Sequence, residues 1–536
     1  MAGVRAHHPA AIVGFVAAVI VTVLGIWKAS FVAGAADAYG YVSEADLIAQ
    51  GHLSIDQQFV RTLPWPFADW SFAPAGYRPA LQRGFIVPTY PAGVPVIMAL
   101  FERVAGRTAP FYVVPLLGGL AVWLAALLGA EIHDDVTGIA VAVLLATSPI
   151  FLVELMAPAS DVAATCWWTL ALVSALRPTT NSAVTSGLAA AMAVLTRPNL
   201  VVLDAAIAVF LAARAIGDSE YRHQSIVRLS AFVATAALGC VIVARMNMVL
   251  YGAPLRSGYE SLGTLFAWSN ARANLAHYPR WLIQTQTPFM AVGLFAPWIV
   301  RPNRNRTDID EIRRVWFLIA WVGVVWGSYL FYRPFGSEEW TYLRFLLPAY
   351  PAMVTLAVLT LFDGLARILR DSKRATFIAC ATCATLAGWQ LSRSLVLGAF
   401  SARSVERRYV DVGHYVETML PLNTICIARL HAGSLRYYGN RLTLYYDWLQ
   451  PRWLDAAVRE LTARGYHPVI VVERDEETGF RERFADINTF GRLDWPPSAE
   501  LKTPVDVRIY DPSERDRYSS GDRIVTRLIE PWKRFR

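Results

Sequence analysis

The feature that most constrains this chain is a series of long apolar runs, separated by short polar loops, across residues 1–399. A helix of about 20 apolar residues crosses the hydrocarbon core of a bilayer. Hydrophobic residues make up 55% of the 536 residues and charged residues only 17%, whereas a soluble domain carries about 25% charged residues. The run lengths and the shortage of charge together predict a polytopic α-helical membrane protein.

We predict about eleven membrane-spanning helices. Segment 91–105 is also apolar, but it is short and contains Glu102 and Arg103, so we interpret it as an interfacial or re-entrant helix. No small-residue cleavage signature follows the first run, which therefore predicts a retained span rather than a signal peptide. The predicted spans are 11–33, 109–130, 136–155, 160–176, 183–196, 198–215, 227–250, 287–300, 315–332, 343–365 and 375–397.

Basic residues concentrate in three loops, and these loops predict the orientation of the spans in the membrane. These loops are Arg301–Arg306 with Arg313 and Arg314, Arg367–Arg374, and Arg214–Arg228. Loops rich in Lys and Arg face the cytoplasm, so the N-terminus is predicted to be cytoplasmic. The net charge of +8 is explained by this topology and does not indicate nucleic-acid binding. The segments predicted on the outer face are 34–108, 154–161, 251–286, 333–342 and everything after about 398.

The sequence changes character at about residue 400. Ile425–Leu430, Val469–Glu473 and Val507–Tyr510 have the composition of strands. Trp453–Arg464 has helical spacing and ends at Gly465. We therefore predict two domains: a membrane domain over 1–399, and a small α/β domain over 400–536 on the outer face.

The stretch Gly433–Tyr438 within that second domain is polar and aromatic enough to contact an acceptor molecule. Packing within the fold is the simpler explanation for it.

Motifs for metal, redox or nucleotide chemistry are missing from the sequence. The five cysteines are scattered, and Cys380 and Cys383 form a CxxC inside an apolar segment, where packing explains them. His52, His277 and His414, like His431, are isolated in sequence. No P-loop, HExxH or GxSxG motif occurs. The sequence therefore predicts no metal site, while the need for a divalent cation stays open.

The first predicted outer loop begins with acidic and aromatic residues. If the stretch from Asp37 is helical, Asp37, Tyr41 and Glu44 lie at i, i+4 and i+7 and share one face. A carboxylate near the membrane surface, beside tyrosines, can act as a general base toward a sugar hydroxyl. A solvated helix with ordinary charges explains the same pattern equally simply.

A second acidic point, with Glu154 and Asp161, is predicted on the same membrane face. Asp161 opens the span 160–176, where a carboxylate suits the positive end of a helix. Helix capping alone accounts for Asp161. Its predicted location on the same face as Asp37 favours a functional role.

Three arginines are also predicted at or near that face: Arg197, Arg256 and Arg344. Arginine at membrane depth is costly and usually has a partner or a ligand. Its planar guanidinium suits a phosphate, so a lipid phosphate is a candidate ligand. The alternative for each is an interfacial anchor whose charged end reaches the water.

Six short motifs follow one another along the chain: Asp37–Tyr41, Pro88–Pro95, Ser160–Val162, Leu195–Asn199, Tyr251–Tyr259 and Leu343–Pro351. In this order, they resemble the motifs of the GT-C superfamily of membrane glycosyltransferases. The likeness is greatest to the branch with bacterial relatives of the protein O-mannosyltransferases and with the lipid A aminoarabinose transferases. Each motif is weak alone, and the ordered set is fairly specific.

The resemblance implies an inverting transfer of a sugar from a polyprenyl-phosphate donor to an envelope acceptor (a lipid, a glycan or a protein). The reaction would take place on the outer face of a bacterial cytoplasmic (inner) membrane. Asp37 matches the family's acidic residue after the first span, the candidate general base, and Asp161 matches a second acidic position. The chain departs from the aminoarabinose transferases at Tyr90-Pro91, where those proteins have a lysine. The expected donor-phosphate residues are Arg197, Arg256, Arg344 and Tyr90, and the expected acceptor or pocket residues are Tyr39, Tyr41, Glu44 and Tyr259.

Two other classes of protein remain as alternatives. A transporter or flippase for a lipid-linked sugar would show internal repeats and polar sites near the bilayer midplane, and neither is evident here. A non-catalytic scaffold would bind envelope partners through its outer domain, and its acidic and arginine positions would be freely replaceable.

The predicted orientation can be tested with a reporter fused after Arg536. Because the basic loops should face the cytoplasm, a reporter that is active only in the cytoplasm should be silent there. An alkaline phosphatase fusion, active only outside, should be active at the same position. Strong cytoplasmic-reporter activity would reverse the orientation.

Overall fold

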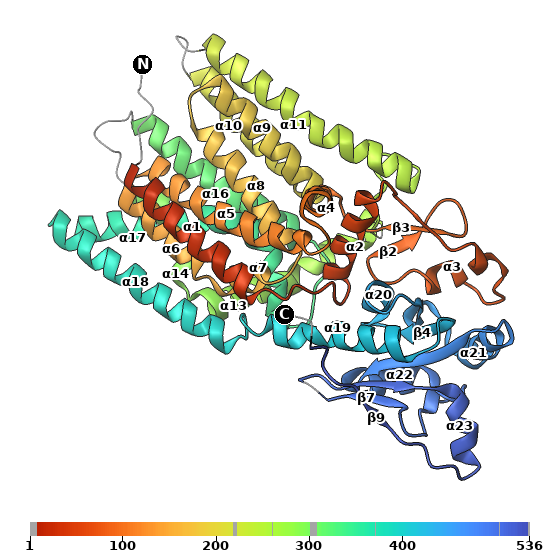
Figure 1. Ribbon diagram of the computed structural model, residues 1–536. Helices are drawn as coiled ribbons and strands as arrows, with labels where there is room; N and C mark the ends of the chain where they lie inside the picture. The colour runs from red at the N-terminus through yellow and green to blue at the C-terminus, as the bar shows by residue number, and fades with distance from the viewer. Residues whose placement is uncertain are drawn as a thin grey trace. The chain divides into compact units, whose positions relative to one another are not determined.

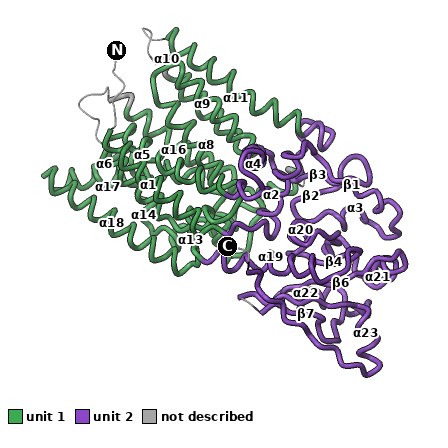
Figure 2. The backbone as a smooth tube through the Cα atoms, in the orientation of Figure 1, with its two compact units in different colours: residues 1–29, 112–246, 260–400 green, residues 30–111, 247–259, 401–536 purple. Residues whose placement is uncertain are grey.

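The computed structural model describes residues 8–217, 222–259, 261–300, 308–369, 371–502 and 504–533. The chain forms two compact units (Figures 1 and 2). Unit 1 contains residues 1–29, 112–246 and 260–400, and unit 2 contains residues 30–111, 247–259 and 401–536. The basic stretch Arg301–Arg306 and part of the loop 214–228 lie outside the described residues, as do Arg370 and residues 1–7.

Unit 1 is built from helices, and every predicted span contains helical structure. Helices α6 and α7 form one bent pair, and the 3₁₀ segment η6 runs directly into α17. Helix α11 passes from unit 1 into unit 2 at Asn247. The helices are α1 (His8–Lys28), α5 (Val113–Ile132), α6 (Asp135–Ala146), α7 (Pro149–Leu155), α8 (Ser160–Leu176), α9 (Thr180–Thr196), α10 (Val202–Gly217), α11 (Arg222–Tyr251), α12 (Leu262–Leu265), α13 (Ala271–Gln286), α14 (Phe289–Val292), α15 (Ala296–Ile299), α16 (Asp308–Leu330), η6 (Trp340–Ala349), α17 (Tyr350–Leu369) and α18 (Ser372–Val396).

Four helices of the described chain are long and apolar enough to cross a membrane by length and composition. They are His8–Lys28, Ala109–Ile132, Arg222–Tyr251 and Trp340–Leu369, and the α6–α7 pair, bent by 61°, would make a fifth. The helices in the other predicted spans are shorter or less apolar. The total of about eleven spans therefore stays a prediction.

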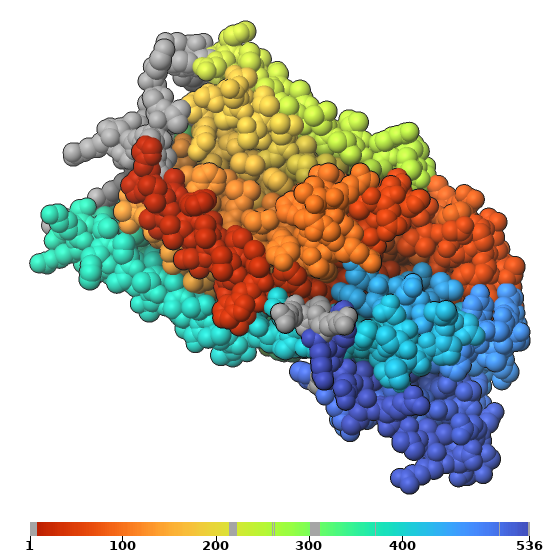
Figure 3. Space-filling model, viewed as in Figure 1, coloured from red at the N-terminus to blue at the C-terminus, as the bar shows by residue number. Residues whose placement is uncertain are grey.

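Helix α1 has one face that packs on α5 and another that exposes large apolar side chains. Its glycines face α5, where a Cβ on Gly14 would lie 2.5 Å from the Cβ of Ala126. Large apolar side chains on its other side are exposed: Ile12 by 63%, Ile20 by 62% and Trp27 by 65%. That side is visible along the red helix in Figure 3. Burying it in lipid removes apolar surface from water, so the helix is suited to a lipid boundary.

The first part of unit 2, residues 30–111, is a small mixed structure. Helices α2 (Asp37–Ala49) and α4 (Gly93–Ala105) pack together, and α4 occupies the predicted interfacial segment. Three short strands form an antiparallel sheet in the order β1-β3-β2. The remaining elements of this part are β1 (Ile55–Asp56), η1 (Gln58–Thr62), α3 (Ala68–Ser71), β2 (Tyr77–Pro79), β3 (Phe85–Pro88) and η2 (Ala109–Tyr112).

Residues 401–536 form a six-stranded sheet in the order β5-β4-β6-β8-β7-β9. β5, β4 and β6 are parallel, and β8 pairs antiparallel with β6 and β7. Strands β4, β6 and β8 and helix α21 lie where the sequence predicts strands and a helix. The elements are α19 (Ala402–Met419), β4 (Thr424–Ala428), α20 (Ala432–Tyr437), β5 (Leu442–Tyr445), α21 (Leu454–Ala463), β6 (His467–Glu473), α22 (Arg474–Phe484), β7 (Ala499–Leu501), β8 (Val507–Tyr510), α23 (Pro512–Ser519) and β9 (Arg527–Leu528).

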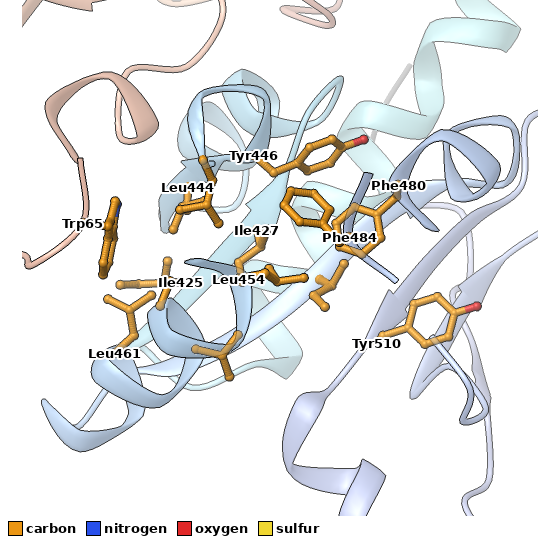
Figure 4. Packing of buried hydrophobic residues seen from close by; sticks show 14 of the residues in the cluster. Trp65, Ile425, Ile427, Leu444, Tyr446, Leu454, Leu461, Phe480, Phe484 and Tyr510 are labelled. Carbon is orange, nitrogen blue, oxygen red and sulfur yellow. The ribbon is translucent and has the colours of Figure 1, made fainter. Parts of the chain in front are cut away.

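The two parts of unit 2 share one hydrophobic core. Trp65 and Phe72, from the first part, belong to the same buried cluster as Ile425, Leu444 and Phe480 of the sheet and its helices (Figure 4). Trp65, Ile425 and Leu444 are less than 4% exposed. Residues 30–111 are therefore held on the C-terminal sheet by packing, rather than forming a free loop.

Candidate functional site

Asp37 is the first residue of α2, and the backbone before it is strained. Phe31 and Ala35 both have positive φ, 55° and 48°, which is uncommon for residues other than glycine. Such conformations cost free energy and concentrate at functional sites. The Tyr90 hydroxyl donates a hydrogen bond of 2.7 Å to Oδ1 of Asp37. The carboxylate is therefore held at the start of the helix, where backbone N–H groups favour negative charge.

Tyr90 is itself held in place by three neighbours. Its ring stacks on Tyr41 with the ring centroids 4.8 Å apart, and Tyr259 lies 6.0 Å away on another side. Gly40 allows this approach, because a Cβ there would lie 2.3 Å from Cε2 of Tyr90. Asp37, Tyr41, Tyr90 and Tyr259 are called the Asp37 cluster below. All four are residues that the sequence analysis selected.

The electrostatics of the Asp37 cluster keep the Tyr90 hydroxyl protonated. Burial raises the pKa of Tyr90 well above its usual value, and the negative charge of Asp37 raises it further. Tyr90 therefore acts as a hydrogen-bond donor. The sequence resemblance had associated this position with the donor phosphate, whereas in the structure its hydroxyl binds Asp37.

Glu44 shares the predicted helix with Asp37 but lies in the interior. It is 2% exposed, and its Oε2 accepts no hydrogen bond from any residue that the structure describes. Burial raises the pKa of Glu44 well above its usual value, so the neutral acid is favoured. Tyr39 is also buried, and it lies with Ser43 on the opposite side of α2 from Asp37.

A second cluster lies in unit 1, around Asp161 at the start of α8. Arg197 follows the last residue of α9 and donates a short hydrogen bond to Oδ1 of Asp161. Its other nitrogens contact the Ser160 hydroxyl at 3.3 Å and the Tyr329 hydroxyl at 3.4 Å. Both Asp161 and Arg197 are buried. A charge-assisted pair of this kind is the usual way to keep two charges inside a protein.

Arg344 approaches the same carboxylate from η6. Its Nη1 lies 3.9 Å from Oδ2 of Asp161 and 4.0 Å from Oε2 of Glu154. The guanidinium carbons of Arg197 and Arg344 lie 5.6 Å and 5.5 Å from the Phe345 ring. Two carboxylates thus face two arginines. We call Glu154, Asp161, Arg197, Arg344 and Tyr329 the Asp161 cluster.

Arg256 differs from the other two predicted arginines. It lies in unit 2 with an exposed side chain, and it makes no side-chain hydrogen bond or ion pair with the described residues. Arg78, which the sequence analysis did not select, donates to the backbone carbonyls of Ser257 at 3.3 Å and Gly258 at 3.1 Å. Burial and the charge of Arg256 lower the pKa of Arg78. Arg78 therefore holds the loop that carries Arg256.

The predicted residues thus gather in two places. Asp37, Tyr41, Tyr90 and Tyr259 form one cluster in unit 2, while Asp161, Arg197 and Arg344 form another in unit 1. Sequence reasoning missed Tyr329, because one hydroxyl inside an apolar segment gives no signal. Glu154 was noticed beside Asp161, and its ion pair with Arg344 now gives it a place in the cluster.

The fold is similar to that of several membrane enzymes of known structure. No family model matches the chain, and no curated protein matches it by sequence. Solved structures do match, and they are GT-C glycosyltransferases that depend on polyprenyl-phosphate donors. The resemblance stated from the sequence is confirmed at the level of the fold.

The matching structures include two of ArnT from Cupriavidus metallidurans, one bound to undecaprenyl phosphate and one in the apo state. Their TM-scores are 0.53 and 0.51 at 12% and 13% identity, and each match covers 93% of this chain and 97% of that one. An oligosaccharyltransferase from Archaeoglobus fulgidus, tethered with an acceptor peptide, matches with a TM-score of 0.50 at 12% identity. That match covers 90% of this chain and 72% of the other. Identities this low establish the fold alone.

A further structure of the Archaeoglobus fulgidus oligosaccharyltransferase, in complex with Zn and sulfate, matches with a TM-score of 0.50 at 13% identity. In this chain, no group of three or more His, Cys, Asp or Glu side chains among the described residues could hold a metal ion. The Asp161 cluster has two carboxylates, but two arginines already face them.

The close approach of Gly40 to Tyr90 allows the packing of the Asp37 cluster to be tested directly. Gly40→Ala should force the Tyr90 ring to move, and overpacking of this kind costs about 1–3 kcal/mol. The measurement is the unfolding midpoint of the purified protein. Gly479→Ala is the matched control, because Gly479 is also helical and a Cβ there meets no atom within 4 Å. Equal midpoints for the two variants would contradict the packing described.

Proposed function

We propose that this protein is a membrane glycosyltransferase that moves a sugar from a polyprenyl-phosphate donor to an envelope acceptor, with inversion at the anomeric carbon. The observation that carries the proposal is the Asp37 carboxylate, held by Tyr90 at the start of α2 in a fold shared with GT-C enzymes. ArnT, which was solved with undecaprenyl phosphate, supports the class of donor. The acceptor peptide on the Archaeoglobus fulgidus enzyme is an example of an acceptor in this fold.

The proposed step is a single displacement. The oxygen of an acceptor hydroxyl attacks the anomeric carbon of the donor sugar, and the bond from that carbon to the phosphate oxygen breaks. The polyprenyl phosphate leaves with the electron pair, and the hydroxyl proton passes to Asp37. The Tyr90 hydrogen bond orients the carboxylate, and positioning a base in this way contributes to catalysis.

The Asp161 cluster would serve the donor phosphate. Negative charge develops on the leaving phosphate, and arginines aimed at that charge lower the barrier. Asp161, being paired with Arg197, is better suited to orienting the arginines than to accepting a proton. Arg344 is the better phosphate ligand of the two, because its side chain is 22% exposed, whereas that of Arg197 is 10% exposed.

The proposed setting is the outer face of a bacterial cytoplasmic membrane, crossed by about eleven helices. A lipid-linked donor keeps its phosphate at the interface between lipid and water. The reacting groups must therefore act near the outer ends of the spans, where the sequence places Asp37, Asp161 and Arg344.

Replacing Asp37 by asparagine tests the chemical step. Asp37→Asn keeps the size of the side chain but removes the proton acceptor, so transfer should fall by about 10²–10⁴-fold. Protein level and donor retention should stay near wild type. The assay is transfer of labelled sugar from a polyprenyl-phosphate donor in purified membranes. Near wild-type transfer would remove Asp37 from the mechanism.

Replacing Arg344 by alanine tests donor binding. The loss of one charge-assisted contact to phosphate is worth about 1.5–3 kcal/mol, which is about a 10–150-fold weaker retention of the donor. Arg280→Ala is the matched control, because Arg280 pairs with the exposed Glu338 and should have little effect. Unchanged donor retention in Arg344→Ala would contradict the assignment. Movement of the donor lipid across the membrane without transfer would instead support a flippase.

A further inference from the structure

Helix α2 has a second polar face, which lines a cavity of about 730 Å³ inside unit 2. Tyr39, Ser43, Asp46 and Gln50 lie on this face at i, i+4, i+7 and i+11. At about 100° per residue, Tyr39 points to the side of the helix away from Asp37. The opposite wall comes from residues 417–442, at the end of α19 and around α20 and β5.

The floor of the cavity is a preformed polar cluster. The Tyr77 hydroxyl donates to the Ser43 hydroxyl at 3.0 Å, and the centroids of the Tyr39 and Tyr77 rings lie 5.8 Å apart. Arg436 lies close enough for its charge to act on both tyrosines. Its Nη2 donates to the Gln57 side chain at 2.8 Å, so the guanidinium is held in place before any ligand arrives.

The rim of the cavity carries donors and acceptors in balance. Arg107 lies over the Tyr437 ring at 5.5 Å and reaches Asp46 at 3.5 Å. The Gln50 amide donates to the other oxygen of Asp46 at 2.9 Å. Asn440 on the opposite wall adds an amide group with both functions.

This lining selects one class of ligand. Arg107, Arg436 and Arg441 line the cavity together with the Asp46 and Glu417 carboxylates, and a free phosphate cannot use the acceptors that these carboxylates provide. A lipid chain would place hydrocarbon against the charged Arg107 and Asp46 and the Gln50 amide, which line the cavity, and this is costly. A saccharide has hydroxyls that both donate and accept, together with apolar ring faces that pack on tyrosines. The volume falls within the range of about 300–1,000 Å³ that is usual for small-molecule sites.

We propose that this cavity binds a neutral saccharide, as a subsite for a non-reacting sugar of the acceptor. The cavity runs along α2 from Tyr39 to Gln50 on the side opposite Asp37, so a sugar bound there is separate from the one that carries the reacting hydroxyl. Binding energy from such remote parts of a substrate can be used to position the reacting end. The proposal that the cavity binds a saccharide depends only on the lining of the cavity. The proposal that this saccharide is part of the acceptor rests on the proposed function.

The test is a titration of the purified full-length protein with maltose, chitobiose and xylobiose in the absence of any donor. Saturation-transfer NMR measures the binding of each disaccharide. Gln50→Trp places a large ring at the mouth of the cavity and should weaken binding by more than 10-fold. Gln50→Ala removes one hydrogen-bonding group and should weaken binding by about 5-fold. His52→Trp is the matched control, because His52 is exposed nearby and does not line the cavity.

The outcomes separate this proposal from the proposed function. Saccharide binding that Asp37→Asn retains and Gln50→Trp loses supports the cavity, whether or not transfer is observed. Three results would overturn it: no millimolar binding of any of the three disaccharides, equal binding by wild type and Gln50→Trp, or binding of inorganic phosphate in their place. If the wild-type protein binds a disaccharide but Gln50→Trp leaves the KM for a glycan acceptor unchanged, the cavity binds a saccharide but does not recognise the acceptor.

Discussion

The arrangement of unit 2 depends on the packing of residues 30–111 against the C-terminal sheet. Trp65 and Phe72 enter the core formed by β4, β5 and the neighbouring helices, and this contact joins segments more than 350 residues apart in sequence. Helix α2 is positioned by this shared core, since α20 packs against it and a Cβ on Gly433 would collide with the Tyr39 ring. The positions of Asp37 and of the cavity both follow from where α2 is held.

Unit 1 satisfies a different constraint, which is the cost of placing charge in an apolar interior. Asp161 and Arg197 are both buried, and each would be strongly unfavourable alone. The addition of Glu154 and Arg344 keeps the group balanced in charge and adds contacts with Phe345 and Tyr342. Removal of one partner would leave another charge buried and unpaired, which is strongly destabilising.

The sequence predicted the elements of this fold better than their pairing. β4 and β6 are continuous apolar runs buried on both faces, so they could be recognised, whereas β7 and β9 have three and two residues and show no period. Asp37 and Tyr90 were both selected, but no local pattern links residues 53 positions apart. Glu44 was placed correctly on a helix, and its burial depends on residues from other elements that helical spacing does not reveal. The number of spans does not follow from length alone, because several helices of unit 1 are too short to cross a bilayer unaided.

The two faces of α2 bear on how a transferase could limit hydrolysis of its donor. Water is a competing nucleophile at any activated sugar, and a base that is always aligned would hydrolyse the donor between encounters. Asp37 and the lining of the cavity belong to one helix, so a ligand that shifted α2 from the cavity side would also shift the carboxylate on the other side. Occupancy of the saccharide cavity would then narrow the orientations open to Asp37, and alignment of the base would be coupled to the arrival of the correct acceptor.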